Sequence, residues 1–338
     1  MRWALALAIA CCCTAQPASA QRDLPRSARL DGSFLQLLAT HGTWQPAEWE
    51  RLFGYFKALG LSELIVQWSV LDELAFYARP TEASDPASPL ESVLAAADAA
   101  QMRVLVGLVH DSDYWDRIRG EPASVAGYLQ RLETRSLDAA RQMQRMLARH
   151  PSFEGWYLTV EVDDLNWIEP ARQSVLFDHL RRVSEQLRRL EPGARIALSG
   201  FTNAQLDPKA FEAFWHALLT TAPAIDIVLL QDGVGVRKLA TDEVSLYMSA
   251  ARGAVRRSGR TLRAVVETFE QTAGPPVDDK PFSAAPTGIG RLSRQIQIAA
   301  PYASSVIAFS VPEYLSPAGG PAASSLYDQY RAWIAGRR

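Results

Sequence analysis

Short apolar runs alternate with longer amphipathic stretches eight times from Ser33 onward, and this alternation restricts the possible folds more than any other feature. The apolar runs have the length of strands. They cover residues 33–38, 63–69, 103–110, 155–163, 195–202, 226–233, 262–269 and 305–311. Helical periodicity follows near residues 46–59, 90–100, 125–149, 170–190, 208–220, 241–258, 289–299 and 324–335. Proline opens several of the helical segments and Gly60, Gly193 and Gly259 close others.

Eight strand and helix pairs predict an α/β chain that folds as one (β/α)8 TIM barrel domain over residues 21–338. Runs such as IALSGF and IVLLQ are apolar throughout, as expected for strands buried on both faces. An open doubly wound sheet is the structural alternative. It is disfavoured because no glycine-rich phosphate loop follows any of the predicted strands.

The first twenty residues have the pattern of a signal peptide. Arg2 precedes an apolar stretch from Trp3 to Cys13, and Ala18-Ser19-Ala20 forms a cleavage site before Gln21. We therefore expect an exported protein, periplasmic or extracellular. The alternative is a lipoprotein anchored through Cys11, because small residues precede that cysteine.

All three cysteines lie within this segment, at positions 11 to 13. The cleaved chain would then contain no disulfide and no thiolate ligand for a metal. The full chain has 35 basic and 37 acidic residues, which nearly balance and form no long run of one sign, and this argues against nucleic acid as a partner. No stretch is long enough for a membrane span. Protein partners are not indicated.

Two predicted strands end in glutamates, Glu161 in the fourth and Glu267 in the seventh. The carboxyl ends of all strands in a parallel barrel meet at one face, where such barrels carry their active sites. Glycoside hydrolysis requires a proton donor for the leaving oxygen and a second carboxylate as nucleophile or base. The pair therefore predicts glycoside cleavage; a salt bridge at each strand end is the structural alternative.

Further polar and aromatic residues gather at or near the predicted carboxyl ends of the strands. Aromatic rings pack on the C–H faces of sugars, while amides and carboxylates bind hydroxyl groups; the alternative is that each aromatic residue belongs to the core. The predicted substrate-binding residues are Gln36, Gln67, Trp68, His110, Tyr157, Asp163, Asn166, Trp167, Asn203, Gln231, Asp232, Phe269 and Tyr314. Carbohydrate is thus the expected partner.

Other chemistries have weaker support. Glu161, Asp163 and Asp164 could offer oxygen ligands to a cation, but no histidine cluster or H-E-x-x-H pattern accompanies them. The G-x-S-x-G pattern of serine hydrolases is absent as well. We expect no metal and no cofactor. Two long connections, 71–89 and 272–288, follow strand ends and could be lids over the active face or surface excursions.

Several segments resemble a bacterial family catalogued as domain of unknown function 4434. They are DGSFLQ (31–36), TWQPAEWERLFGYFKALGLSELIVQW (43–68), GWYLTVEVDD (155–164), LLQDGVGV (229–236) and VVETFE (265–270). The resemblance covers nearly the whole mature chain. It implies a TIM barrel related to glycoside hydrolases, and the family has no settled activity.

The chain is also similar to the large (β/α)8 clan of retaining glycosidases, in which the acid/base glutamate ends the fourth strand and the nucleophile ends the seventh. That similarity implies Glu161 as acid/base and Glu267 as nucleophile. One position departs from the clan, because Val160 stands where an asparagine commonly precedes the acid/base. The expected function is a retaining glycoside hydrolase acting on a polysaccharide or oligosaccharide. The alternative is a non-catalytic carbohydrate-binding barrel that assists polysaccharide export or assembly.

Overall fold

The computed structural model describes residues 28–77 and 87–337. The predicted signal peptide, with Cys11 and the cleavage site, lies outside the described residues, as does part of the connection 71–89. None of the described helices combines the length and the apolar character that a membrane crossing requires.

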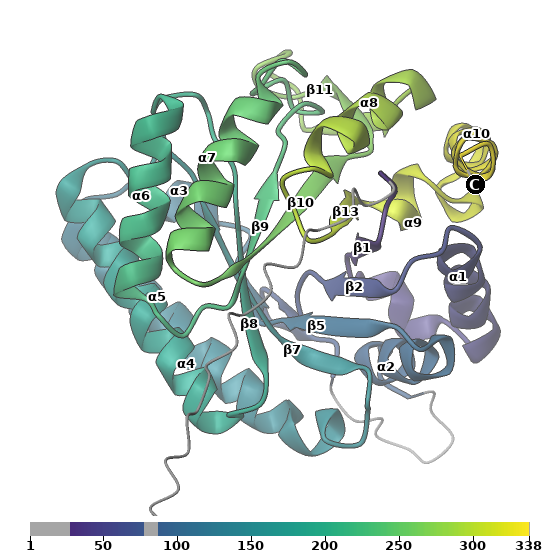
Figure 1. The fold of residues 1–338 in the computed structure, drawn as a ribbon. Coiled ribbons are helices and arrows are strands. Elements are labelled where there is room, and N and C mark those ends of the chain that lie inside the picture. Colours follow the sequence, from purple (N-terminus) through teal and green to yellow (C-terminus); the bar gives the residue numbers. More distant parts are fainter. Residues whose placement is uncertain (1–27, 78–86, 338) are drawn as a thin grey trace, which may run out of the picture.

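Eight parallel strands close into a barrel, in the order β1-β13-β10-β9-β8-β7-β5-β2 (Figure 1). Their bounds are β1 Gly32–Leu35, β2 Glu63–Val66, β5 Arg103–Gly107, β7 Phe153–Val162, β8 Arg195–Gly200, β9 Ile227–Gln231, β10 Thr261–Glu267 and β13 Val306–Phe309. Each strand falls within or close to one of the eight apolar runs. The predicted (β/α)8 barrel is therefore confirmed, and closure of the sheet rules out the open doubly wound alternative.

A long helix follows each barrel strand and packs on its outer side (Figure 1). These helices are α1 Pro46–Ala58, α2 Pro89–Ala100, α4 Pro122–Leu147, α5 Pro170–Leu190, α6 Pro208–Thr221, α7 Val244–Arg257, α8 Ile289–Ala299 and α10 Pro321–Ala335. Six of them start at a proline, whose fixed φ and missing N–H suit the first helical position. Short helical turns complete the chain: η1 Ala39–Thr43, α3 Tyr114–Arg117, α9 Val311–Tyr314 and η2 Pro317–Gly319.

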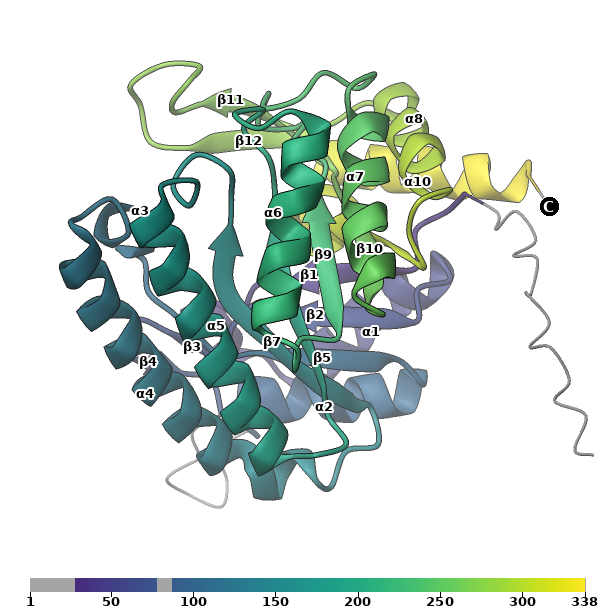
Figure 2. The ribbon, with the colours of Figure 1, turned by 60° about the vertical axis from the view of Figure 1, so that its left-hand side comes forward.

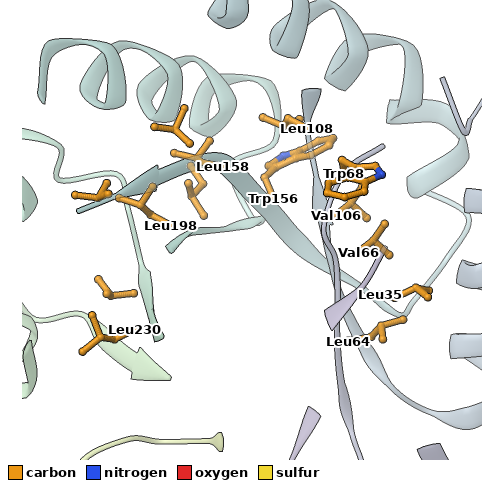
Figure 3. Close-up of a cluster of buried hydrophobic side chains, with 14 of the residues drawn as sticks. Leu35, Leu64, Val66, Trp68, Val106, Leu108, Trp156, Leu158, Leu198 and Leu230 are labelled. Carbon is orange, nitrogen blue, oxygen red and sulfur yellow. The ribbon is translucent and has the colours of Figure 1, made fainter. Parts of the chain in front are cut away.

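The apolar side chains form two layers. The larger one lies between the strands and the helices, where Val66, Val106, Trp156, Leu158 and Leu198 point away from the barrel axis (Figure 3). The smaller one fills the barrel and receives at least one side chain from each strand: Phe34, Ile65, Leu105, Tyr157, Ala197, Ile227, Leu229, Val265 and Ile307. The barrel interior is thus a packed core, and a site can form only above or below it.

Strand β7 carries an irregularity just before Glu161. Leu158 lies opposite Leu198, but the next aligned pair is Glu161 with Ser199, so β7 contains two additional residues at this point. Because side chains alternate along a strand, an even insertion keeps Glu161 on the inner side with Tyr157. The irregularity therefore lengthens the strand and lifts Glu161 above the core.

The connection 272–288 is ordered as most of a β-hairpin. Strands β11 (Phe269–Ala273) and β12 (Ser283–Pro286) pair antiparallel directly after β10 and extend beyond the barrel (Figure 2). A second small sheet combines β3 (Val70–Leu71) and β4 (Leu74–Ala75), which follow β2, with β6 (Val109–His110), which follows β5. Both additions lie at the carboxyl end of the barrel.

The first and last described segments meet at the opposite, amino end of the barrel. The backbone N–H of Asp31 donates to the carbonyl of Val306 at 2.8 Å, and that of Leu30 donates to the Tyr330 hydroxyl at 2.7 Å. Since β1 begins at Gly32, the chain enters the barrel from this face.

Candidate active site

A cavity of about 680 Å³ opens at the carboxyl end of the barrel. Every barrel strand, or the segment directly after it, contributes a lining residue. The lining comprises Gln36, Gln67, Trp68, His110, Trp115, Thr159, Glu161, Phe201, Asn203, Gln231, Gly233, Val236, Arg237, Lys238, Glu267, Phe269, Gln271, Pro275, Pro276, Phe282 and Phe309. This cavity coincides with the face where barrels of this type bind ligands.

Nine of the predicted site residues line this cavity: Gln36, Gln67, Trp68, His110, Glu161, Asn203, Gln231, Glu267 and Phe269. Both glutamates are among them, so the fourth and seventh strands deliver two carboxyl groups to one cavity. The other six predicted residues, Tyr157, Asp163, Asn166, Trp167, Asp232 and Tyr314, are not part of the lining.

Glu161 is half-buried at the end of β7. Its Oε1 accepts a 2.9 Å hydrogen bond from the Gln231 side chain, and its backbone carbonyl accepts one from the Tyr114 hydroxyl at 2.7 Å. Burial raises the pKa of Glu161, and the Gln231 bond and the Lys238 charge oppose this shift. A carboxyl group with a raised pKa, open to the cavity, is suited to donate a proton.

Glu267 lies deeper, with only 3% of its surface exposed. The loop after β9 covers it: the backbone N–H of Val236 donates to Glu267 Oε2 at 3.0 Å, and a Cβ placed on Gly235 would lie 2.9 Å from the same oxygen. Gly235 therefore allows the loop to approach this closely. Burial, followed by the negative charge of Asp232, raises the pKa of Glu267 to about 8.

Asp232 supports Glu267 from behind the cavity wall. Its Oδ1 accepts the backbone N–H of Glu267 at 3.3 Å, and its Oδ2 accepts a 2.6 Å bond from the Gln295 side chain. Burial raises the pKa of Asp232 to about 6. The predicted substrate contact thus lies one layer behind the cavity and acts on the position and charge of Glu267.

Lys238 is a cationic residue of the cavity that the sequence did not single out. Its Nζ lies 3.2 Å from the centroid of the Phe201 ring, and no carboxylate of the described residues forms an ion pair with it. Burial lowers the pKa of Lys238, while the carboxylates of Glu161 and Glu267 raise it. One ammonium group therefore senses both glutamates. Its loop position gives no periodic signal, which is why sequence reasoning missed it.

The opposite wall carries amides and a stacked ring pair. Gln36 Nε2 donates to Gln67 Oε1 at 2.8 Å, and the rings of Trp68 and His110 stack with centroids 5.0 Å apart. Trp68 is only 6% exposed and donates its indole N–H to the carbonyl of Leu37 at 2.7 Å. Burial lowers the pKa of His110, so the ring is neutral near pH 7. These groups offer hydroxyl-binding capacity beside an aromatic surface.

The loop after β7 holds three of the predicted residues away from the cavity. Asp163 Oδ1 accepts the backbone N–H groups of Leu165 and Asn166, at 2.7 and 2.8 Å, and its Oδ2 accepts the Asn166 side chain at 2.9 Å. Asp163 and Asn166 thus shape a turn. Trp167 is fully buried in the outer core. In this structure it has no face to present to a ligand.

Two aromatic residues of the predicted set also lie behind the lining. Tyr157 belongs to the barrel interior, where its hydroxyl bonds to that of Ser199 at 2.6 Å. Tyr314 packs against Phe269, with ring centroids 5.1 Å apart. The aromatic surface of the cavity comes instead from residues that the sequence left out of the site, chiefly Trp115, Phe201, Phe282 and Phe309. Phe201 and Phe309 fall within the apolar runs 195–202 and 305–311, and Trp115 lies in the short helix α3, whereas Phe282 lies at the hairpin, where no periodic pattern applies.

Within the part of the chain that the structure describes, no three histidine, cysteine, aspartate or glutamate residues are grouped as a metal site would require.

Solved structures with a similar fold include carbohydrate-active enzymes. A "putative alpha-L-fucosidase" from Bacteroides thetaiotaomicron is 18% identical, with a TM-score of 0.73 over 94% of this chain and 99% of that one. The endo-1,4-beta-mannanase of Rhizomucor miehei is 12% identical, with a TM-score of 0.52 over 91% and 95%. At these identities the likeness establishes a glycosidase-like fold.

Sequence comparison identifies relatives without an assigned activity. The uncharacterized protein YbcH of Escherichia coli K12 is 25% identical over 217 residues, which span 62% of this chain and 69% of that protein. The model of the family described as "Domain of unknown function (DUF4434)" matches residues 30–320. The chain therefore belongs to the DUF4434 family, as its motifs indicated.

Proposed function

We propose that this protein is a glycoside hydrolase that cleaves a polysaccharide or oligosaccharide through Glu161 and Glu267. One observation carries the proposal: two carboxyl groups, one from the fourth and one from the seventh strand of a glycosidase-like barrel, line the same cavity. The amides of Gln36, Gln67 and Gln231 line it as well and could bind sugar hydroxyls.

In the proposed retaining mechanism, Glu267 attacks the anomeric carbon and Glu161 protonates the departing oxygen. Glu161 then removes a proton from the water that releases the sugar from Glu267. The raised pKa of Glu161 supports its role as acid. The Val236 N–H supports the other role, because a bond from a backbone donor favours the ionised form of Glu267.

The protonation of Glu267 places a condition on this mechanism. A nucleophilic Glu267 must be ionised, whereas burial and Asp232 raise its pKa to about 8. Burial and the Asp232 charge therefore favour the form of Glu267 that holds a proton in this conformation. Reaction would proceed through the fraction that has moved this proton away. A shift of the loop that carries Gly235 and Val236 would increase that fraction by admitting solvent to the carboxylate.

The test uses a panel of aryl glycosides and soluble polysaccharides with the wild type, Glu161→Gln and Glu267→Gln. We expect Glu267→Gln to abolish both turnover and the covalent glycosyl-enzyme seen by mass spectrometry. Glu161→Gln should chiefly slow substrates with poor leaving groups, since good ones need little protonation. Retained anomeric configuration by NMR would agree with carboxyl groups about 5–5.5 Å apart. An inverted product, or turnover that survives Glu267→Gln, would refute the mechanism.

A second candidate is a non-catalytic barrel that binds carbohydrate during polysaccharide export or assembly. The specific observation in its favour is the cover over Glu267, which is 3% exposed beneath the Gly235 loop. This candidate predicts that the wild type binds a polysaccharide without cleaving it and that Glu267→Gln binds equally well.

We also propose that the protein is exported to the periplasm or the extracellular space, on the evidence of residues 1–20. The mature chain should begin at Gln21 and remain unaffected by reductant in thermal unfolding, because the cysteines would have been removed. A mass spectrum with a lipid-modified Cys11 would favour the lipoprotein instead.

A further inference from the structure

We propose that the β11–β12 hairpin forms a second carbohydrate-binding position at the mouth of the cavity, where a sugar ring stacks on Phe282. This inference rests on the proposed function for its ligand, a glycan. It concerns a sugar unit other than those joined by the bond that Glu161 and Glu267 would cleave.

Phe282 is unusual in its exposure. It is 58% exposed, the highest value among the large apolar side chains that the structure describes, and it still lines the cavity. Pro275 and Pro276 line the same part of the mouth and are exposed as well. An aromatic ring at a cavity entrance is exposed to water, and covering it with a ligand is favourable because apolar surface is removed from water.

The Phe282 ring is supported from the protein side. It meets Phe269 nearly edge to face, with centroids 6.0 Å apart and an interplanar angle of 81°. Phe269 is 4% exposed and packs in turn on Tyr314 and Phe309. A row of aromatic residues thus joins Phe282 to the barrel, so its exposed side is the side available for stacking.

The loop of the hairpin is held in one shape by its own hydrogen bonds. The Gln271 side chain is 2% exposed and donates to the carbonyls of Ala273, Gly274 and Pro275 at 3.1, 2.9 and 3.0 Å. Gly274 has a φ of +93°, and a Cβ placed there would lie 2.9 Å from the Cα of Phe282. A preformed loop loses little conformational entropy when it binds a ligand.

The hairpin is also tied to the loop over Glu267. The backbone N–H of Gln271 donates to the carbonyl of Gly235 at 2.9 Å, and Gly235 lies against the Glu267 carboxyl group. The stacking position and the proposed nucleophile thus belong to adjoining walls of one cavity. A glycan that enters between them could contact Phe282 with one ring while another approaches the glutamates.

The mixed character of the mouth favours a sugar over an apolar ligand or a protein partner. Phe282 and the two prolines are apolar, whereas Arg237 and Lys238 line the same cavity with charged groups. A pyranose ring has C–H faces and hydroxyl groups around its edge, which matches this mixture. A protein partner would call for a broader apolar patch than one ring and two prolines.

The experiment measures retardation in native gels that contain soluble xylan, glucomannan, galactan or dextran. Phe282→Ala should bind about tenfold more weakly than the wild type, in the range of stacking losses per ring for bases on aromatic side chains. Phe282→Trp should bind at least as tightly as the wild type. The matched control is Leu246→Ala, since Leu246 on α7 is 54% exposed outside the cavity, and it should behave as the wild type.

The outcomes separate this inference from the proposed function. Binding that depends on Phe282 without cleavage would retain the hairpin position and refute the hydrolase. Cleavage by the wild type with equal binding and equal KM in Phe282→Ala would refute the hairpin position alone. If none of the four polysaccharides retards the wild type, the inference is also overturned, whatever the activity on aryl glycosides.

Discussion

The two ends of the barrel are built from the same strands but differ in how their buried charged side chains are paired. At the amino end, Arg263 of β10 contacts Glu154 of β7 at 2.8 Å and Glu63 of β2 at 3.3 Å. At the carboxyl end, β10 and β7 supply Glu267 and Glu161. Lys238 acts on both glutamates and Arg291 acts on Glu267, but among the described residues neither cation forms an ion pair with them.

The difference separates an end whose buried charges are paired from an end whose buried charges are not. A buried charge is tolerated when a partner offsets the loss of hydration, and the amino end meets this condition. The carboxyl end does not, and its carboxyl groups respond with raised pKa values. Perturbed carboxyl groups in a cavity are typical of functional sites.

The largest effect on stability is expected from breaking the buried ion pairs of Arg263 at the amino end. Arg263→Met should destabilise the fold by about 3 kcal/mol, the lower part of the range for a buried pair that loses one partner. The loss is limited because Arg103 still contacts Glu63 at 2.6 Å. Urea unfolding gives the value, with Arg263→Lys as control. An unchanged midpoint would mean that the amino end contributes nothing to stability.

Removing the charge of Glu267 at the carboxyl end should have the opposite effect and stabilise the fold. The pKa of Glu267 rises from 4.5 to about 8 on folding, so the folded state takes up a proton and loses stability as the pH increases between these values. Glu267→Gln keeps the shape without the charge. We expect it to match the wild type near pH 4.5 and to be more stable at pH 9, by on the order of 3 kcal/mol.

Thermal unfolding at the two pH values measures this difference. A gain that is equal at both would show that the charge of Glu267 is not its cause.

Two charges near Glu267 should move its titration in opposite directions. Asp232→Asn removes the negative charge that raises the pKa of Glu267, so the pKa should fall. The Gln295 side chain can turn to suit the new amide, because its Oε1 has no partner among the described residues. Lys238→Met removes a positive charge that lowers the pKa of both glutamates, so both values should rise.

Carbon-13 NMR of labelled glutamate carboxyl groups follows these titrations without a substrate. In an active enzyme the alkaline limb of kcat/KM should move with them, to lower pH for Asp232→Asn and to higher pH for Lys238→Met. Shifts in the same direction would contradict the electrostatic assignment.

The smallest effect is expected at an exposed pair on the carboxyl side. Arg237 and Glu270 lie 3.6 Å apart with 54% of each side chain exposed. Water screens such a pair, so Arg237→Met should change the free energy of unfolding by less than about 1 kcal/mol. A loss as large as that of Arg263→Met would show that burial does not distinguish the two ends.

Periodicity was enough to predict the barrel, because eight apolar runs must pack as eight strands whatever their loops do. It also placed Glu161 and Glu267 at one end, since parallel strands share a direction. The depth at which individual side chains are buried was not predictable. Trp68 and Trp167 follow their strands in similar sequence surroundings, yet one lines the cavity and the other is buried in the outer core. Helix packing decides this, and single-sequence patterns do not record it.

Loop conformation was the other missing information. Lys238 and Phe282 reach the cavity only because particular turns carry them there, through backbone conformations such as those of Gly233 and Gly274, both at positive φ. Glycine in a loop indicates that an unusual conformation is available, but it does not say where the neighbouring side chains will point.

The entry of the chain at the amino end of the barrel has a practical consequence for attachment. The bonds of Leu30 to Tyr330 on α10 and of Asp31 to Val306 on β13 hold this entry on the face away from the cavity. A fusion partner, an immobilisation resin or a tether joined directly at residue 28 would therefore be attached on that far face. The cavity mouth and the β11–β12 hairpin would then point outward, free to meet polymers too large to diffuse behind the protein.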